Sequence, residues 1–329
     1  MKLHHYIAIT VLLITGCSVL QPNPTERINF TAEDTYPEGV AYDKRKNLYY
    51  VSSARLGTIG KVSPAGVYSI LYADNSLKSS YGIKVHPDGK RLYVCVGDAN
   101  YSKFTSPDTR TKMARLLIID LESGRKLSDI NLADLKPGKH FPNDLTFDNA
   151  GNAYITDSFA HAIYKVDADA KATLLVSDEK FVTEGVGING VAFHAAGFLI
   201  VDNSATGMLY KVSLSNPKNV EFIKSDQFFL GADGLLLNAP DSLTVVVNGG
   251  NDKIFKLSSD DEWRTAKLSA TTLIADRFTY PSTATLNAGQ VWVMNARFNE
   301  LVDSNSVPAK QFAIQKAVFK PVPKPKDQK

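Results

Sequence analysis

Six residues occupy the same position in six similar segments of the chain, and their side chains could act together on a cation or a substrate. They are Glu38, Tyr81, Asn143, Asn189, Asp233 and Ser282. Two carboxylates, two amides, a phenol and a hydroxyl provide oxygen atoms without a thiolate or an imidazole. Hard oxygen ligands suit one divalent cation, Ca²⁺ first, with Mg²⁺, Mn²⁺ and Zn²⁺ as alternatives. Each residue alone is more typical of a turn that enters a strand, so the prediction depends on their convergence.

The segments that begin at these residues have the pattern of β-hairpins. In Phe141–Ser158, F-P-N-D-L-T-F-D-N-A-G-N-A-Y-I-T-D-S, the alternating run Leu145–Phe147 precedes a turn containing Gly151 and a second run, Ala153–Thr156. Alternation on both sides of a glycine-containing turn is the sequence signal for a hairpin. In all six copies an Asp, His or Asn falls five residues after the first position. Self-similarity at a period of about 40 residues indicates a propeller or a solenoid.

Four strands in each of six repeats predict an all-β fold, a six-bladed β-propeller with four-stranded antiparallel blades. In such a ring the first residues of the innermost strands converge at one end of the central channel. Closure requires the two chain ends to share a blade, because a sheet edge would otherwise stay open. We therefore expect the N-terminal strand Arg27–Thr31 to pair with Phe312–Phe319. Asp98–Ala114, a polar insertion in blade two, is either a lid at one mouth of the channel or a surface loop.

The two ends of the chain predict export and a tail. Residues 1–16 combine Lys2, an apolar run too short to span a membrane and a small-residue end, as signal peptides do. The residues I-T-G-C that end at Cys17 resemble a bacterial lipobox, which predicts a lipoprotein lipidated at Cys17, in the outer membrane facing the periplasm. The alternative is an ordinary secretory signal. The rest divides into a tether (17–26), one propeller domain (27–319) and a basic tail rich in Pro and Lys (320–329).

Charge and cysteine usage exclude other classes of protein. The formal net charge is +3, but Lys2 and the four lysines of the tail supply it, so residues 17–319 carry a small net negative charge. No basic surface is available for a phosphate backbone, so we expect a small-molecule substrate and no nucleic acid. We also expect a monomer that contacts a membrane only through a lipid anchor at Cys17. With Cys17 and Cys95 alone, neither a disulfide framework nor a thiolate metal site can form.

Four motifs give the chain a resemblance to a known family. In order, P-E-G-V-A-Y-D, the hairpin that opens F-P-N-D, I-N-G-V-A-F and A-D-G-L resemble the senescence-marker-protein/gluconolactonase/luciferin-regenerating-enzyme family of six-bladed propellers. The match runs from about Pro37 to Ala296. The resemblance implies that Glu38, Asn189 and Asp233 bind a divalent cation. It also implies that Asn143 completes the cluster and contacts the substrate.

The same resemblance has a departure that bears on the reaction. Sugar-lactonase members of the family carry Arg two residues before this Asn, whereas this chain has Phe141 there, so His140 and Tyr81 become the candidate substrate contacts. The hypothesis is a metal-dependent hydrolase of lactones or related esters, in which the cation polarises the carbonyl and Asp233 activates water or takes a proton. The alternative is a non-catalytic ligand- or protein-binding propeller lipoprotein with a structural calcium. A vacant coordination position at an open channel mouth would favour the enzyme.

Overall fold

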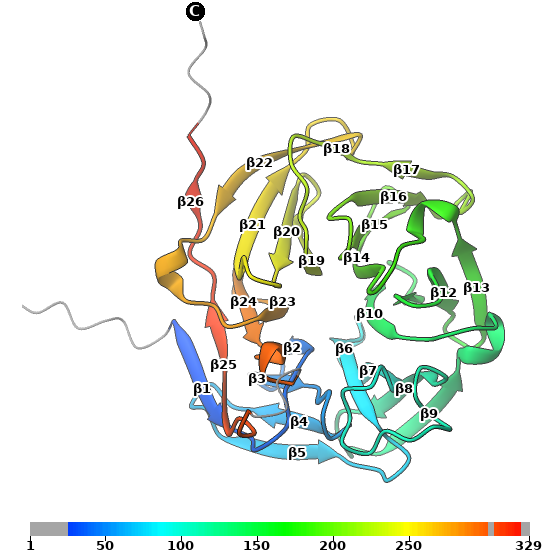
Figure 1. Ribbon diagram of the computed structural model, residues 1–329, viewed down its shortest axis with the longest axis vertical. Helices are drawn as coiled ribbons and strands as arrows, with labels where there is room; N and C mark the ends of the chain where they lie inside the picture. The colour runs from blue at the N-terminus through cyan, green and yellow to red at the C-terminus, as the bar shows by residue number, and fades with distance from the viewer. Residues whose placement is uncertain (1–25, 302–305, 324–329) are drawn as a thin grey trace, which may run out of the picture.

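Short alternating segments of the chain pair into antiparallel sheets, because each strand can bury one face against a neighbouring sheet. The computed structural model describes residues 26–301 and 306–323, and within these residues six sheets surround a central channel (Figure 1). Each sheet is one blade, and successive strands of a blade run from the channel outward. The predicted all-β fold, a six-bladed propeller with four-stranded antiparallel blades, is confirmed.

In the first three blades the strand order follows the chain. Blade one contains β2 (Val40–Asp43), β3 (Leu48–Val51), β4 (Ile59–Val62) and β5 (Tyr68–Tyr72). Blade two contains β6 (Ser79–Val85), β7 (Arg91–Gly97), β8 (Ala114–Asp120) and β9 (Lys126–Asn131), followed by the short 3-10 helix η1 (Ala133–Leu135). Blade three contains β10 (Pro142–Phe147), β11 (Ala153–Asp157), β12 (Ala162–Val166) and β13 (Ala172–Ser177), followed by η2 (Glu179–Phe181).

Among the last three blades, the chain ends add strands to blades five and six. Blade four contains β14 (Ile188–His194), β15 (Phe198–Asn203), β16 (Leu209–Ser213) and β17 (Val220–Phe222). Blade five contains β19 (Ala232–Ala239), β20 (Ser242–Val247), β21 (Lys253–Ser258) and β22 (Thr265–Thr271), with β18 (Lys224–Ser225) and β26 (Lys320–Pro321) on its outer edge. Blade six contains β23 (Pro281–Asn287), β24 (Gln290–Asn295), β25 (Gln311–Lys316) and β1 (Arg27–Thr31), with η3 (Ile274–Asp276) and η4 (Phe298–Glu300) beside it.

The two chain ends close the ring, as predicted. β1 pairs antiparallel with β25 in a register that runs from Arg27 opposite Gln315 to Thr31 opposite Gln311. The pairing therefore stops before Phe319. Beyond it the chain crosses to blade five, where Pro321 of β26 lies opposite Ala270 of β22. The ordered strands thus reach past residue 319, where the domain was expected to end.

The apolar core lies between adjacent blades, where the faces of two sheets meet. Ala41 and Tyr50 of blade one pack in one cluster with Ile83 and Val94 of blade two. Similar clusters join blades three and four and blades five and six. Buried side chains in these clusters hold the six inner strands at a fixed distance around the channel.

The predicted signal peptide (1–16), the lipidation site Cys17 and most of the tether (17–26) lie outside the described residues, as does the end of the tail. These predictions therefore remain predictions. Among the residues that the structure does describe, none forms a helix with the length and apolar character needed to cross a membrane.

Candidate functional site

The repeated first position lies in a bulge at the start of most inner strands. In β6, β10, β14, β19 and β23 the register with the second strand shifts at the two residues that open the repeat. In β14, for example, Ile188 pairs with Asn203 and Val191 with Val201, which leaves Asn189 and Gly190 outside the ladder. A bulge bends the strand and changes where its side chains point. It therefore frees the first residue of each repeat from the sheet.

A glycine after the first position lets neighbouring blades approach closely at the channel. A Cβ atom on Gly190 would lie 2.4 Å from the backbone oxygen of Asp233 in the next blade. A Cβ atom on Gly39 would lie 2.4 Å from the backbone oxygen of Tyr81. Such distances exclude any side chain without a backbone shift. The glycines of the Glu-Gly and Asn-Gly motifs thus set how tightly the ring converges.

The predicted cluster meets at one cavity. Glu38, Asn143, Asn189 and Asp233 all line a space of about 250 Å³ at the mouth of the channel, which we call the channel-mouth cavity. Its other lining residues are Tyr101, Phe141, Val186, Ser204, Ala205, Gly231, Asn248, Gly249, Tyr280 and Phe298. The four residues come from blades one, three, four and five, so only ring closure brings them together.

Two serines fix the direction of the amide oxygens. The hydroxyl of Ser158 donates to the backbone oxygen of Ile188 at 2.7 Å, so its oxygen is free to accept, and it accepts from Nδ2 of Asn143 at 3.0 Å. Ser204 in the next blade likewise donates to a backbone oxygen and accepts from Nδ2 of Asn189 at 2.9 Å. Because each NH₂ group is held at a serine, each Oδ1 points away from that serine.

Asp233 is held by an amide in the equivalent place. Nδ2 of Asn248 donates to Oδ2 of Asp233 at 2.6 Å and to the backbone oxygen of Pro281 at 3.1 Å. Ser158, Ser204 and Asn248 each follow their partner by 15 residues. Sequence reasoning missed these three residues, although this constant spacing was a signal that could have found them.

The oxygen atoms that face the cavity lack partners within the protein. Both carboxylate oxygens of Glu38 and the Oδ1 atoms of Asn143 and Asn189 are buried and accept no hydrogen bond from the described residues. Burial, together with Asp233 and Asp144, raises the pKa of Glu38 well above its usual range. Burial, with Asp144 nearby, raises the pKa of Asp233 to about 8. Unpaired buried acceptors are costly, so this set fits a cation that all of them could coordinate.

A cation here would depend on amide oxygens as well as carboxylates. Within residues 26–301 and 306–323, no group of three or more His, Cys, Asp or Glu side chains has the arrangement of a metal site. Glu38 and Asp233 supply the charge, and Asn143 and Asn189 supply neutral oxygen atoms. A mixed set of this kind matches the chemistry of Ca²⁺ better than that of Zn²⁺.

Two residues of the predicted ring do not reach the channel-mouth cavity. Tyr81 is fully buried, and its hydroxyl oxygen accepts from the backbone N–H of Ala99 at 3.0 Å. Its ring packs against that of Phe141, which lines the cavity, with the two ring centroids 4.7 Å apart. Ser282 is buried and donates to the backbone oxygen of Glu38. Both side chains are committed to the structure of the ring and do not line the cavity.

His140 is also outside the cavity. Its ring is 2% exposed, and Nδ1 lies 2.8 Å from Oδ2 of Asp157, which also accepts from the hydroxyl of Tyr164 at 3.3 Å. The other oxygen of Asp157 accepts from the backbone N–H of Phe141 at 2.7 Å. Asp157 therefore caps the turn before β10 and holds His140 against it. A substrate contact for His140 would require this arrangement to open.

Two further carboxylates, Asp144 and Asp202, are buried close to the carboxylates of the site. Oδ1 of Asp144 accepts from the backbone N–H of Leu145 and lies 3.8 Å from Nζ of Lys84, whereas its Oδ2 is buried and unpaired. Oδ1 of Asp202 accepts from the backbone N–H of Gly190, and its Oδ2 is also unpaired. Burial raises the pKa of both carboxyl groups. The surroundings of the site are therefore rich in carboxyl groups, with Lys84 as the neighbouring counter-charge.

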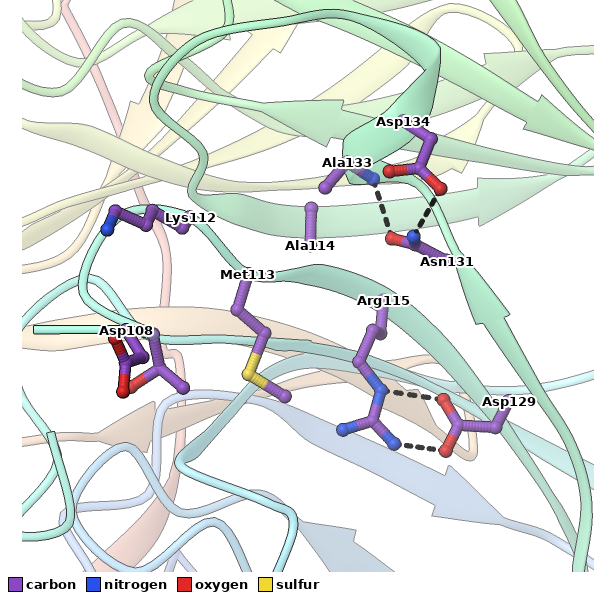
Figure 2. Close-up of a pocket in the computed structure, with 10 residues that line it drawn as sticks. Asp108, Lys112, Met113, Ala114, Arg115, Asp129, Asn131, Ala133 and Asp134 are labelled. Atoms are coloured by element: carbon purple, nitrogen blue, oxygen red, sulfur yellow. Dashed lines mark hydrogen bonds and ion pairs between the residues drawn. The ribbon is translucent and has the colours of Figure 1, made fainter. Parts of the chain in front are cut away.

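A second polar cavity differs in its bonding. It measures about 380 Å³, lies beside β8 and β9, and is called here the blade-two pocket (Figure 2). Arg115 binds both carboxylate oxygens of Asp129, with Nε to Oδ1 at 2.7 Å. Nδ2 of Asn131 donates to Asp134 at 2.8 Å, and Oδ1 of Asn131 accepts from the backbone N–H of Ala133. None of the described side chains that line it carries a buried polar atom without a partner.

Fold and site together define a six-bladed propeller with an oxygen-lined cavity at the mouth of its channel. No protein-family model and no curated protein matches the chain. Solved structures match its fold. The allergen Mala s 1 of Malassezia sympodialis superposes with a TM-score of 0.70 at 15% identity, over 90% of this chain and 96% of that one.

Two enzyme-related structures match over similar lengths. A luciferin-regenerating enzyme gives a TM-score of 0.59 at 15% identity, over 90% of this chain and 98% of that one. A "putative gluconolactonase" gives 0.56 at 15% identity, over 92% and 96%. The resemblance inferred from the four motifs is therefore confirmed for the fold, which these propellers share with this chain. At such identity the comparison carries the fold alone, and one fold supports several reactions.

Proposed function

We propose that the chain binds one divalent cation, Ca²⁺ first, through Glu38, Asn143, Asn189 and Asp233, and hydrolyses lactones or related esters. The observation that carries the proposal is the set of buried, unpaired oxygen atoms that face one cavity. Without a cation, the Glu38 carboxylate and two amide oxygens would stay buried without a partner, close to a second carboxylate, Asp233, which is unfavourable. The serines that hold the amide NH₂ groups outward favour the same role.

The chain's own residues can bind, orient and accept a proton. A bound cation would supply polarisation of an ester carbonyl and stabilisation of the developing negative charge. Oδ2 of Asp233 is held by Asn248, which fixes the orientation of the carboxylate. Burial raises the pKa of Asp233 toward neutrality, which suits a group that takes a proton from water. Burial with the nearby Asp233 also raises the pKa of Tyr101 and Tyr280, so both phenols stay protonated and able to donate.

The fold comparisons support this class of reaction without naming a substrate. Propellers of the same fold include a luciferin-regenerating enzyme and a "putative gluconolactonase". A virginiamycin B lyase from Staphylococcus aureus shares the fold as well, with a TM-score of 0.57 at 14% identity over 87% of each chain. Because lyases also use this fold, the test must measure hydrolysis itself.

The test is activity of the purified chain with each of Ca²⁺, Mg²⁺, Mn²⁺ and Zn²⁺ against a panel of lactones and aryl esters. We expect hydrolysis with at least one cation and its loss in Asp233→Ala. Asp129→Ala, which alters the blade-two pocket, serves as the matched control. A chain that binds Ca²⁺ but hydrolyses nothing above the Asp233→Ala background would overturn the enzyme and leave the non-catalytic propeller with a structural calcium.

The predicted location is proposed on the sequence alone. We propose export with lipidation at Cys17, because the I-T-G-C motif follows a short apolar run. Cys17→Ser should move the protein from the membrane fraction of expressing bacteria to the soluble fraction. Unchanged membrane association of Cys17→Ser would contradict lipidation at this residue.

A further inference from the structure

The walls of the channel-mouth cavity are apolar, although its floor is made of oxygen atoms. Five large apolar or aromatic residues line the cavity, and we call them its wall: Tyr101, Phe141, Val186, Tyr280 and Phe298. Among the described residues, none of those that line this cavity is Lys, Arg or His. A ligand in this cavity therefore contacts hydrocarbon and aromatic surface as well as the carboxylates and amides.

The aromatic side chains form a connected wall. The ring centroid of Tyr101 lies 5.3 Å from that of Phe298 and 6.2 Å from that of Phe141. The ring centroids of Phe298 and Tyr280 lie 6.1 Å apart and the rings are stacked. Phe141 is supported from behind by Phe159, with a centroid distance of 5.3 Å. Aromatic pairs at such distances stabilise one another, so the wall is formed before a ligand arrives.

The segment that carries Tyr101 is tied down. Asp98, at the start of the insertion, accepts from the hydroxyls of Thr105 and Thr109, each at 2.7 Å, and from the backbone N–H of Asn100 at 3.1 Å. The hydroxyl of Ser102 donates to the backbone oxygen of Lys78 at 2.6 Å. The insertion Asp98–Ala114 is therefore braced by its own hydrogen bonds, and it contributes Tyr101 to the cavity wall.

Tyr280 and Phe298 are placed by strained backbone. Tyr280 has a φ of +49°, and Arg297, directly before Phe298, has a φ of +59°. Residues other than glycine rarely adopt this conformation, which costs roughly 1–3 kcal/mol. Asp252 supports the first by accepting from the backbone N–H of Tyr280 at 3.1 Å. Backbone strain retained at a cavity wall is typical of residues whose position serves a ligand.

We propose that the channel-mouth cavity takes uncharged esters or lactones with an aromatic or alkyl substituent, and not polyhydroxylated sugar-acid lactones. This inference rests on the proposed function for the reaction, but its argument for the ligand class stands on the wall. An apolar substituent would bury against Tyr101, Phe141 and Phe298, while the ester group reaches the oxygen atoms of the floor. A polyol would leave hydroxyl groups unpaired against the same wall.

The first experiment measures kcat/KM for 4-nitrophenyl acetate, butyrate and phenylacetate with Ca²⁺, alongside hydrolysis of gluconolactone. We expect kcat/KM to rise about fourfold for each added methylene, because each buried CH₂ contributes roughly 0.8 kcal/mol. Phenylacetate should be the best of the esters. A flat or falling series, or gluconolactone as the preferred substrate, would overturn the proposal.

The second experiment measures binding without hydrolysis. The probes are two unreactive amides of similar size, N-methyl-4-phenylbutanamide and N-methylgluconamide, titrated into the Ca²⁺-loaded chain by calorimetry. We expect only the phenyl amide to bind, and Tyr101→Ser to weaken its affinity roughly tenfold through lost apolar contact. Phe104→Ser is the matched control, because Phe104 lies in the same insertion but lines a different cavity and is 48% exposed.

The two experiments separate the two proposals. If no ester is cleaved but the phenyl amide binds and Tyr101→Ser weakens it, the hydrolase is wrong and the ligand class is supported. If esters are cleaved without preference and Tyr101→Ser behaves like Phe104→Ser, the hydrolase stands and the ligand class is wrong. Preferential binding of N-methylgluconamide would also overturn the ligand class.

Discussion

The channel-mouth cavity and the blade-two pocket contain the same kinds of polar residue but satisfy them differently. In the blade-two pocket, Asp129 is bound by Arg115, and Asn131 is bound by Asp134 and Ala133 (Figure 2). At the channel mouth, both oxygens of Glu38 and the amide oxygen of Asn143 have no partner in the described protein. The Asp129 carboxylate is hydrogen-bonded by its neighbours, whereas the Glu38 carboxylate has no hydrogen-bond partner among the described residues.

This difference indicates how a cation-binding site can be distinguished from other polar cavities. Cavity size does not distinguish them, because the blade-two pocket is the larger, at about 380 Å³ against about 250 Å³. What distinguishes them is the unpaired acceptor, since an unmade hydrogen bond of a buried group costs more than a made one contributes. A cavity whose acceptors all point inward with their donors turned away is prepared for a positive charge.

The largest expected effect is on catalysis. Asp233→Ala removes the carboxylate proposed to take a proton, so kcat should fall by about 10²–10⁴-fold. Asp129→Ala removes a carboxylate that pairs with Arg115 and Lys126 and does not line the channel-mouth cavity, so kcat should not change. Steady-state kinetics of both variants with an aryl ester measure the effect. An equal fall in kcat in the two variants would show that the two cavities do not differ in their role in catalysis.

The next effect is on stability in the presence of Ca²⁺. At a concentration one hundred times its Kd, Ca²⁺ should raise the free energy of unfolding by about 2.7 kcal/mol. Asn189→Leu removes an oxygen that faces the cavity and should abolish most of this gain. Asn131→Leu, the same change in the blade-two pocket, should retain it. Urea unfolding with and without Ca²⁺ measures this gain in the free energy of unfolding. Loss of the gain in Asn131→Leu would contradict the assignment of the cation to the channel-mouth cavity.

The gain from Ca²⁺ should also depend on pH. Burial raises the pKa of Asp233 from its ordinary value of 3.8 to about 8, and that of Glu38 rises as well. A raised pKa means that the folded state binds the proton more tightly than the unfolded state does. The resulting stabilisation is fully present at a pH below the pKa of the group in the unfolded state. It is lost as the pH rises through the pKa of the group in the folded state. The free energy of unfolding of the cation-free protein should therefore fall as the pH rises from 3.8 to about 8.

Since a bound cation would take the place of the proton, the stabilisation by Ca²⁺ should increase across that window. Urea unfolding at roughly pH 5 and pH 8, with Ca²⁺ and with a chelator, measures it. Asp129→Ala should show the same pH dependence as the unchanged chain. A stabilisation by Ca²⁺ that is larger at the lower pH would count against these two carboxylates as ligands.

A smaller effect is expected from the residues that orient the ligands. Ser158→Ala removes the acceptor that holds Nδ2 of Asn143, so Ca²⁺ affinity should fall roughly 10–100-fold. Ser106→Ala is a suitable control, because Ser106 bonds only within the insertion, to Thr109. Calorimetric titration with Ca²⁺ compares them. Unchanged affinity in Ser158→Ala would show that the amide is oriented by other contacts.

The smallest effect should come from the blade-two pocket itself. Arg115→Met breaks a partly exposed ion pair with Asp129, and such pairs contribute about 1 kcal/mol or less. The free energy of unfolding should fall by no more than that, while Ca²⁺ affinity stays the same. A change in Ca²⁺ affinity would mean that the two cavities are coupled.

Much of the fold could be predicted because the repeat is visible in the chain. Period-two alternation and a glycine-containing turn identify each hairpin, and the pairing of Arg27–Thr31 with the last blade follows from the need to close the ring. The crossing of Lys320–Pro321 to blade five could not be predicted, since one short pairing on an outer edge leaves no periodic pattern.

The site was predictable where it belongs to the repeat and hidden where it does not. Asn143 and Asn189 share one repeat position, and the structure brings them together. Tyr81 shares that position too, but its hydroxyl accepts a hydrogen bond from Ala99 and its ring packs against Phe141. These two contacts depend on packing between loops. Tyr101, Tyr280 and Phe298 come from loops without a shared motif, so the aromatic wall had no signal in the sequence.

The closure of blade six has a consequence for the order in which the molecule folds. Arg27 donates to Gln315 across 288 residues of chain, so β1 can pair only after β25 has been synthesised. Loop-closure entropy makes such a pairing late, after local hairpins have formed. Because the four oxygen-bearing residues converge only in the closed ring, cation binding should appear at the end of folding and report its completion.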